Sequence, residues 1–125
     1  MKELKFYYCD ICGNIVIKLA DGQGELVCCG EPMVVLQADD TDAALEKHVP
    51  FVEVDGNKVK VVIGEVEHPM TEKHFIEFIT LVQGDKIQTV RLSPEDEPKA
   101  EFLIDEGPFV VYEHCNIHGL WKKEC

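Results

Sequence analysis

The sequence has no apolar run that approaches the roughly 20 residues needed to span a bilayer. Its opening stretch, MKELKFYYCD, contains no hydrophobic signal core. We therefore expect a cytoplasmic protein that does not act in a membrane. Positive charge is also scarce, since 12 Lys and Arg face 24 Asp and Glu and give a formal net charge of -12. This balance argues against nucleic acid or an anionic membrane surface as the partner.

Long amphipathic helices and internal repeats are missing as well. Short apolar runs separated by turn residues predict two hairpins, one over 51–63 with Asp55-Gly56 as a type I′ turn and one over 74–92. Two further strands are expected over 101–105 and 109–115, the second being the last of the chain. A brief helical turn is expected over 43–45. This spacing predicts an all-β sandwich or barrel.

The first 36 residues carry four of the six cysteines and few large apolar side chains. A fragment this small is marginal unless a metal ion holds it, so we expect a separate metal-bound domain over residues 1–36. Without an export signal, the cysteines are expected to be metal ligands or free thiols rather than disulfides.

These four cysteines are arranged as a C-x-x-C motif and an adjacent pair, separated by 15 residues: Cys9, Cys12, Cys28 and Cys29. The motif lets two sulfurs point at one ion, and Gly13 and Gly30 let backbone N–H groups turn toward the thiolates. Neighbouring side chains of an extended segment diverge, so the adjacent pair should distort a tetrahedral site. Distortion favours a redox iron over structural zinc, although a zinc ribbon and a disulfide pair remain open.

A second candidate site starts from the stretch CNIHG, in which a thiol stands three residues before an imidazole. A lone histidine is more often an ordinary core or surface residue than a ligand. Here several histidines fall on expected loops or strand ends, and with the thiol they are His48, His68, His74, Cys115 and His118. Such a mixed nitrogen and sulfur set suits iron, copper or zinc. Blue-copper proteins usually continue with a methionine, and the continuation GLWKKEC has none.

Five motifs in order, YYCDICGN, ELVCCGEPM, TDAALEKHVP, HPMTEKHFIEF and CNIHGLW, span essentially the whole chain. Together they resemble desulfoferrodoxin, the two-iron class of superoxide reductase. The resemblance implies a desulforedoxin-like domain over 1–36 with one iron on Cys9, Cys12, Cys28 and Cys29. It also implies an immunoglobulin-like β-sandwich over 37–125 with a second iron, bound by equatorial His48, His68, His74 and His118 and by axial Cys115.

The resemblance further implies one-electron reduction of superoxide to hydrogen peroxide, with uptake of two protons and no release of dioxygen. In this family the ferrous ion keeps its sixth position open for the substrate. Lys47 would help to capture superoxide, and Glu46 would occupy that position once the iron is ferric. Rubredoxin or a similar small iron protein would supply electrons, and a homodimer is expected. The implied role is detoxification under oxidative stress.

Other functions stay open on the sequence alone. One is an iron electron-transfer protein without superoxide catalysis, another is a zinc-stabilised interaction module, and a superoxide dismutase is the nearest rival in chemistry. His114 matches no ligand of the family and is expected to face away from Cys115 as a structural residue. Cys125 is expected to be an exposed free thiol, and Phe78 stands where many members of the family have tryptophan.

Overall fold

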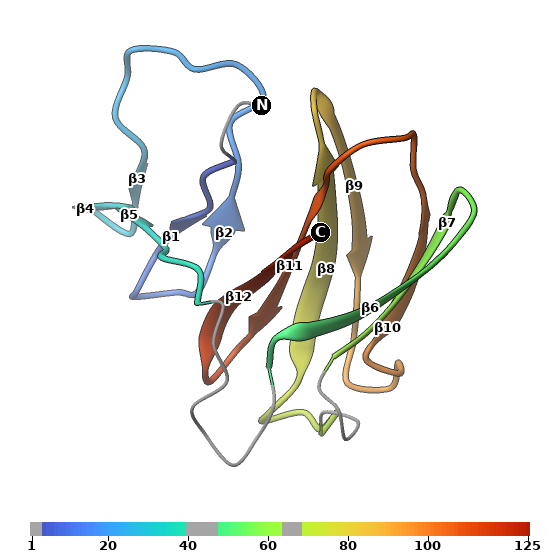
Figure 1. Ribbon diagram of the computed structural model, residues 1–125. Coiled ribbons are helices and arrows are strands. Elements are labelled where there is room, and N and C mark those ends of the chain that lie inside the picture. The colour runs from blue at the N-terminus through green and yellow to red at the C-terminus, as the bar shows by residue number, and fades with distance from the viewer. Residues whose placement is uncertain (1–3, 40–47, 64–68) are drawn as a thin grey trace. The chain divides into compact units, whose positions relative to one another are not determined.

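A computed structural model of the protein describes residues 4–39, 48–63 and 69–125 (Figure 1). Within these ranges the chain forms β-strands and no helix, which confirms the all-β prediction. The chain divides into two compact units, Lys2–Gln37 and Ala38–Cys125. None of the described residues forms a helix that is long and apolar enough to span a bilayer.

The N-terminal unit is built from five two-residue strands: β1 (Tyr7–Tyr8), β2 (Ile15–Val16), β3 (Val27–Cys28), β4 (Glu31–Pro32) and β5 (Val34–Val35). They form a three-stranded sheet in the order β2-β1-β5 and a separate β3-β4 hairpin. Of the described residues of this unit, only Phe6 and Cys9 are buried, while Leu19 and Val27 are exposed. So small a core provides little hydrophobic stabilisation by itself.

The C-terminal unit is a β-sandwich of two antiparallel sheets. Its strands are β6 (Pro50–Asp55), β7 (Lys58–Ile63), β8 (Ile76–Gln83), β9 (Lys86–Arg91), β10 (Lys99–Leu103), β11 (Val110–Cys115) and β12 (Gly119–Glu124). One sheet has the order β10-β7-β6 and the other β12-β11-β8-β9. The sandwich prediction is thereby confirmed.

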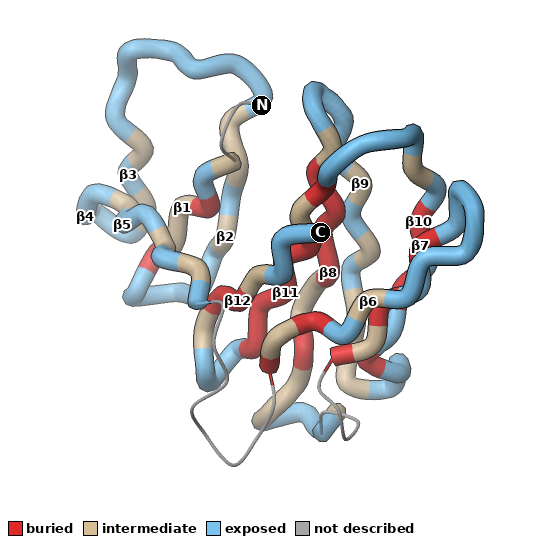
Figure 2. Tube along the Cα trace, in the orientation of Figure 1, coloured by how far each residue is buried: buried red, intermediate tan, exposed pale blue. Residues whose placement is uncertain are grey.

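The core of the sandwich follows the period-two pattern of its strands. On β7 the buried Val59, Val61 and Ile63 alternate with exposed or half-buried residues. They belong to one apolar cluster with Ile79 and Val111 of the other sheet. Figure 2 shows the buried residues, in red, along β8 and β11. Because successive side chains of a strand point to opposite faces, this pattern directs one face of each sheet toward the other.

Both predicted hairpins form, but the first turn differs from its prediction. Asp55 pairs with Lys58, so the two central residues are Gly56 and Asn57 rather than Asp55 and Gly56. Of these two only Gly56 has a positive φ, 62°. A positive φ at the first central position alone is typical of a type II′ turn, whereas type I′ needs it at both.

The expectation that 109–115 is the last strand was wrong, because β12 follows and pairs with β11 along its full length. Cys115 pairs with Gly119, which leaves a loop of residues 116–118 between the strands. Gly119 has φ 88°, the left-handed conformation that commonly closes a three-residue hairpin. The helical turn expected over 43–45 lies outside the described residues.

Candidate metal centres

The C-x-x-C motif closes a tight turn directly after β1. The Cys9 N–H donates to the Asn14 carbonyl at 2.9 Å, and the Gly13 N–H donates to the Cys9 carbonyl at 2.8 Å. Gly13 takes φ 85°, which a residue with a side chain rarely adopts. This turn brings the buried Cys9 and the exposed Cys12 to one end of the small sheet.

Only the first of the adjacent cysteines, Cys28, lies in a strand, which corrects the expectation that both belong to an extended segment and that their side chains diverge. Cys28 pairs with Glu31, so Cys29 and Gly30 are the central residues of the β3–β4 turn. Their φ values are 54° and 77°, the pattern of a type I′ turn. Among the described residues other than glycine, Cys29 alone has a positive φ. This backbone conformation turns the Cys29 thiol toward the sulfur of Cys28.

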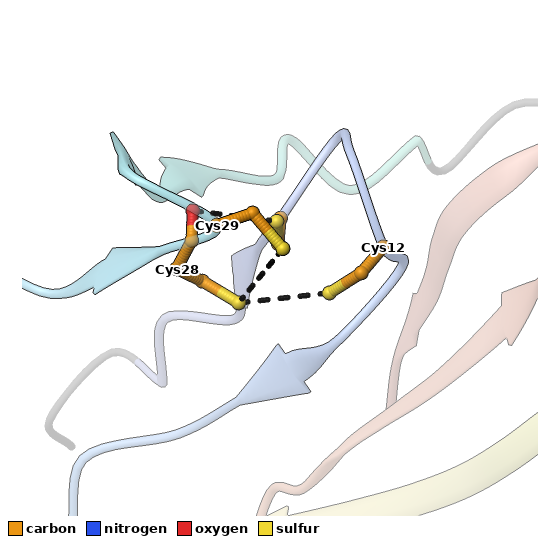
Figure 3. A group of neighbouring side chains, drawn as sticks. Cys12, Cys28 and Cys29 are labelled. Carbon is orange, nitrogen blue, oxygen red and sulfur yellow. Dashed lines mark hydrogen bonds between the residues drawn. The ribbon is translucent and has the colours of Figure 1, made fainter.

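The four cysteine sulfurs converge, with all of them within 4.8 Å of one another. Figure 3 shows Cys12, Cys28 and Cys29 pointing toward a common centre. The Sγ atoms of Cys12 and Cys28 are 3.5 Å apart, and those of Cys28 and Cys29 are 4.0 Å apart. Four sulfurs held tetrahedrally at about 2.3 Å from an ion would lie about 3.8 Å apart. The observed separations bracket that value, so the group fits a single tetrahedral ion.

The pKa values of these thiols show how a bound cation would affect the group. The Cys12 backbone N–H, and to a lesser degree that of Ile11, lowers the pKa of Cys9 to about 7, which favours its thiolate. The sulfurs of Cys12 and Cys28 raise the pKa of Cys29 to about 12. Neighbouring thiolates repel one another, so the four thiols do not ionise together easily. A bound metal ion would offset this repulsion and favour the thiolate form of each cysteine.

The second group of ligands gathers at one end of the sandwich. His48 lies just before β6, His74 just before β8, and Cys115 and His118 at the tip of the β11–β12 hairpin (Figure 1). His74 is held by a pair of backbone hydrogen bonds with Thr71, at 2.9 and 3.1 Å. Segments distant in the sequence therefore supply side chains to one place.

The ligand atoms of His48, His74, Cys115 and His118 lie within 4.8 Å of one another. His48 Nε2 is 3.1 Å from His118 Nδ1, and Cys115 Sγ is 3.7 Å from the same nitrogen. Two nitrogens bound at right angles, each about 2.1 Å from an ion, would be about 3.0 Å apart. The donor set and spacing thus fit a metal ion that accepts both imidazole and thiolate.

The site has a buried side and an open side. Cys115 is 0% and His48 1% exposed, whereas His118 is exposed and His74 is half-buried. Burial keeps water from the thiolate, while the exposed edge leaves room for a small substrate. This combination is typical of a reactive centre rather than a closed structural one.

Three predicted residues, Glu46, Lys47 and His68, lie outside the described residues. His114 does not join the ligand group; its Nδ1 is 2.7 Å from Glu77 Oε1 and its ring stacks on Phe78. This pair lies where β11 and β8 shift register, since His114 pairs with Phe78 and Cys115 with Ile76.

Three residues that were not predicted from the sequence support the ligands. Asn14 donates from Nδ2 to Cys28 Sγ at 3.6 Å, and Trp121 donates from Nε1 to the His118 carbonyl at 3.1 Å. The third is Asn116, directly after Cys115, which bonds to the backbone on both sides of His74. All three stand inside motifs quoted above, Asn14 in YYCDICGN and Asn116 and Trp121 in CNIHGLW, next to the expected ligands.

Comparison with known proteins covers both units. A family model described as "Desulfoferrodoxin, N-terminal domain" matches residues 1–36, and one described as "Desulfoferrodoxin" matches residues 40–124. The chain belongs to the desulfoferrodoxin family. It is 50% identical over 123 residues to a desulfoferrodoxin of Syntrophotalea carbinolica, covering 98% of each chain. It is 46% identical over 119 residues to a desulfoferrodoxin homolog of Archaeoglobus fulgidus, covering 95% of each.

Solved structures lead to the same family. The superoxide reductase from Treponema pallidum superposes with a TM-score of 0.79 at 30% identity, covering 97% of this chain and 98% of that one. A superoxide reductase of the 1Fe class from Giardia intestinalis superposes with a TM-score of 0.58 at 31% identity, covering 64% of this chain and 97% of that one. The likeness extends to both units in the first case.

Proposed function

We propose that the protein is a superoxide reductase that reduces superoxide to hydrogen peroxide at iron bound by His48, His74, Cys115 and His118. One observation carries the proposal: three imidazoles and a buried thiol from distant segments have their ligand atoms within 4.8 Å of one another. Family membership and the structural relatives named superoxide reductase support it. His68 would add the fourth imidazole.

When bound there, ferrous iron supplies the one electron that converts superoxide, with two protons, to hydrogen peroxide. Cys115 would contribute its thiolate, a strong electron donor that favours electron transfer to the substrate. The imidazoles are neutral ligands, so the bound ion would keep a net positive charge that attracts an anion. The exposed side of His118 is where that anion would enter.

Lys47 and Glu46 are proposed to serve the same site. They stand immediately before His48 in the sequence, so both would lie close to a proposed ligand. The Lys47 ammonium would counteract the net charge of -12 and draw superoxide inward. The Glu46 carboxylate would bind the oxidised ion, which has the higher positive charge.

The N-terminal unit is proposed to be a second iron domain over 1–36, ahead of the reductase domain over 37–125. Cys9, Cys12, Cys28 and Cys29 would hold its ion through four thiolates, a ligand set suited to one-electron transfer. Electrons would come from a rubredoxin-like donor. All six cysteines are free thiols in the structure, which supports a cytoplasmic location.

A homodimer is proposed for a separate reason. The small unit exposes several apolar side chains, among them Leu19, Val34 and Val35. Exposed apolar surface on a unit with so small a core is typical of association.

Product analysis tests the proposed reaction. Reduced protein in molar excess is mixed with a known amount of superoxide under anaerobic conditions, and peroxide and dioxygen are measured together. A reductase yields peroxide equal to the superoxide consumed and no dioxygen. A dismutase yields dioxygen as well, and an electron carrier leaves the superoxide to decay at its uncatalysed rate; either result would contradict the proposal. Cys115→Ser should lose the activity, whereas Lys60→Ala, on an exposed position of β7, should keep it.

A further inference from the structure

We propose that Asn116 is a positioning residue, whose side chain fastens the hairpin carrying Cys115 to the segment carrying His74. It would fix the spacing of these two ligands before an ion binds. The inference rests on the metal site of the proposed function and adds a residue that is not itself a ligand.

The hydrogen bonds of Asn116 lie on both sides of His74. Its Oδ1 accepts from the Phe75 N–H at 3.0 Å, and its Nδ2 donates to the Lys73 carbonyl at 3.1 Å. The Asn116 backbone N–H adds a bond to the Phe75 carbonyl at 3.2 Å. One residue therefore holds the backbone immediately before and immediately after a proposed ligand.

The position of Asn116 in the fold explains why its side-chain hydrogen bonds are needed. The regular pairing of β11 with β8 ends at Cys115 and Ile76, one step after a register shift. Beyond that step the described residues show one further backbone hydrogen bond between these segments, the long one from the Asn116 N–H to the Phe75 carbonyl at 3.2 Å. The Asn116 side chain extends the pairing past the strand ends with bonds of the same kind.

The chemistry of the bonds selects asparagine. The carboxamide offers one acceptor and one donor at a fixed separation, and here both are used. Alanine would remove both groups. Glutamine would keep them but displace them by one methylene, so the two bonds could not form together without moving the loop. Neither substitution changes the charge near the ion.

His74 then has two independent attachments. Upstream, its backbone N–H and carbonyl pair with Thr71. Downstream, Asn116 ties Phe75 to the loop that follows Cys115. Because outer partners of metal ligands set ligand orientation, losing the second attachment should weaken metal binding and alter the ligand field.

The test uses Co²⁺ as the probe in the full-length Cys12→Ser protein, in which the four-cysteine group is disabled. Asn116→Ala and Asn116→Gln are compared with the parent and with Asn57→Ala, which removes the same carboxamide from the exposed turn between β6 and β7. Co²⁺ affinity is measured against a competing chelator, and the thiolate-to-cobalt and ligand-field bands are recorded at saturation.

Asn116→Ala and Asn116→Gln are expected to lower Co²⁺ affinity by about 10- to 100-fold and to shift the bands of the bound ion. Asn57→Ala should match the parent. Affinity within twofold of the parent, or a lower affinity with unchanged bands, overturns the inference, since the second result reflects folding alone. If Asn116→Ala does not fold, Asn116→Gln decides by the same criteria. Failure of the parent to bind Co²⁺ through a thiolate would instead contradict the proposed metal site.

Discussion

The indole of Trp121 lies nearly parallel to the imidazole of His48, with ring centroids 5.0 Å apart and planes inclined by 19°. The same indole donates its Nε1–H to the His118 carbonyl. One buried side chain of β12 thus contacts two proposed ligands that are 70 residues apart. The stacking restrains the orientation of the His48 ring, and the hydrogen bond restrains the loop that carries His118.

Substitution of Trp121 should separate these two contacts. Trp121→Phe keeps an aromatic face but removes the N–H, and should lower the free energy of unfolding of the metal-free protein by about 1 kcal/mol. Trp121→Leu removes both and should cost about 3 kcal/mol. Urea unfolding measures both values. Equal losses in the two variants would show that the stack on His48 contributes nothing.

The hydrogen bond between Glu77 and His114 provides a second prediction. It joins β8 to β11 at the register shift behind Cys115, and the His114 side chain is only 5% exposed. Glu77→Ala leaves that buried imidazole without this partner, so stability should fall by about 1 to 3 kcal/mol. Glu95→Ala, at an exposed position between β9 and β10, is the control and should change stability little. Comparable losses of stability in both variants would show that the Glu77–His114 hydrogen bond does not stabilise the fold.

The sequence predicted the strands better than the ligands' surroundings. Alternation on β7 and the turn at Gly56 are local signals, and they indicated the right hairpin. The convergence of His48 with Cys115 is set by the pairing of distant strands, which no local period encodes. The placement of histidines on expected loops and strand ends suggested a common site, and the ordered motifs of the family gave its full ligand set.

Backbone conformation explains two of the errors. Cys29 looked like part of an extended segment because left-handed conformations are uncommon for residues other than glycine. The type I′ turn at Cys29 and Gly30 overrides that preference. Likewise the short loop after Cys115 depends on the φ of Gly119, and the strand that follows it was missed for that reason.

Lys47→Ala is predicted to slow the capture of superoxide by about tenfold or more at low ionic strength, because the protein as a whole repels the anion. The dependence of the rate on salt should also flatten. Stopped-flow or pulse-radiolysis measurement of the second-order rate constant tests this, with Lys60→Ala as the control on β7. An unchanged rate constant at low salt would eliminate the steering role of Lys47.

The claim that nitrogen ligands and one sulfur meet at a single ion is tested most directly by iron K-edge X-ray absorption of the Cys12→Ser protein. With the four-cysteine group disabled, the account predicts iron bound by one sulfur, from Cys115, and by nitrogens that include those of His48, His74 and His118. The sulfur contribution should vanish in Cys12→Ser/Cys115→Ser. A spectrum without sulfur in the first protein, or with several sulfurs, would contradict the account.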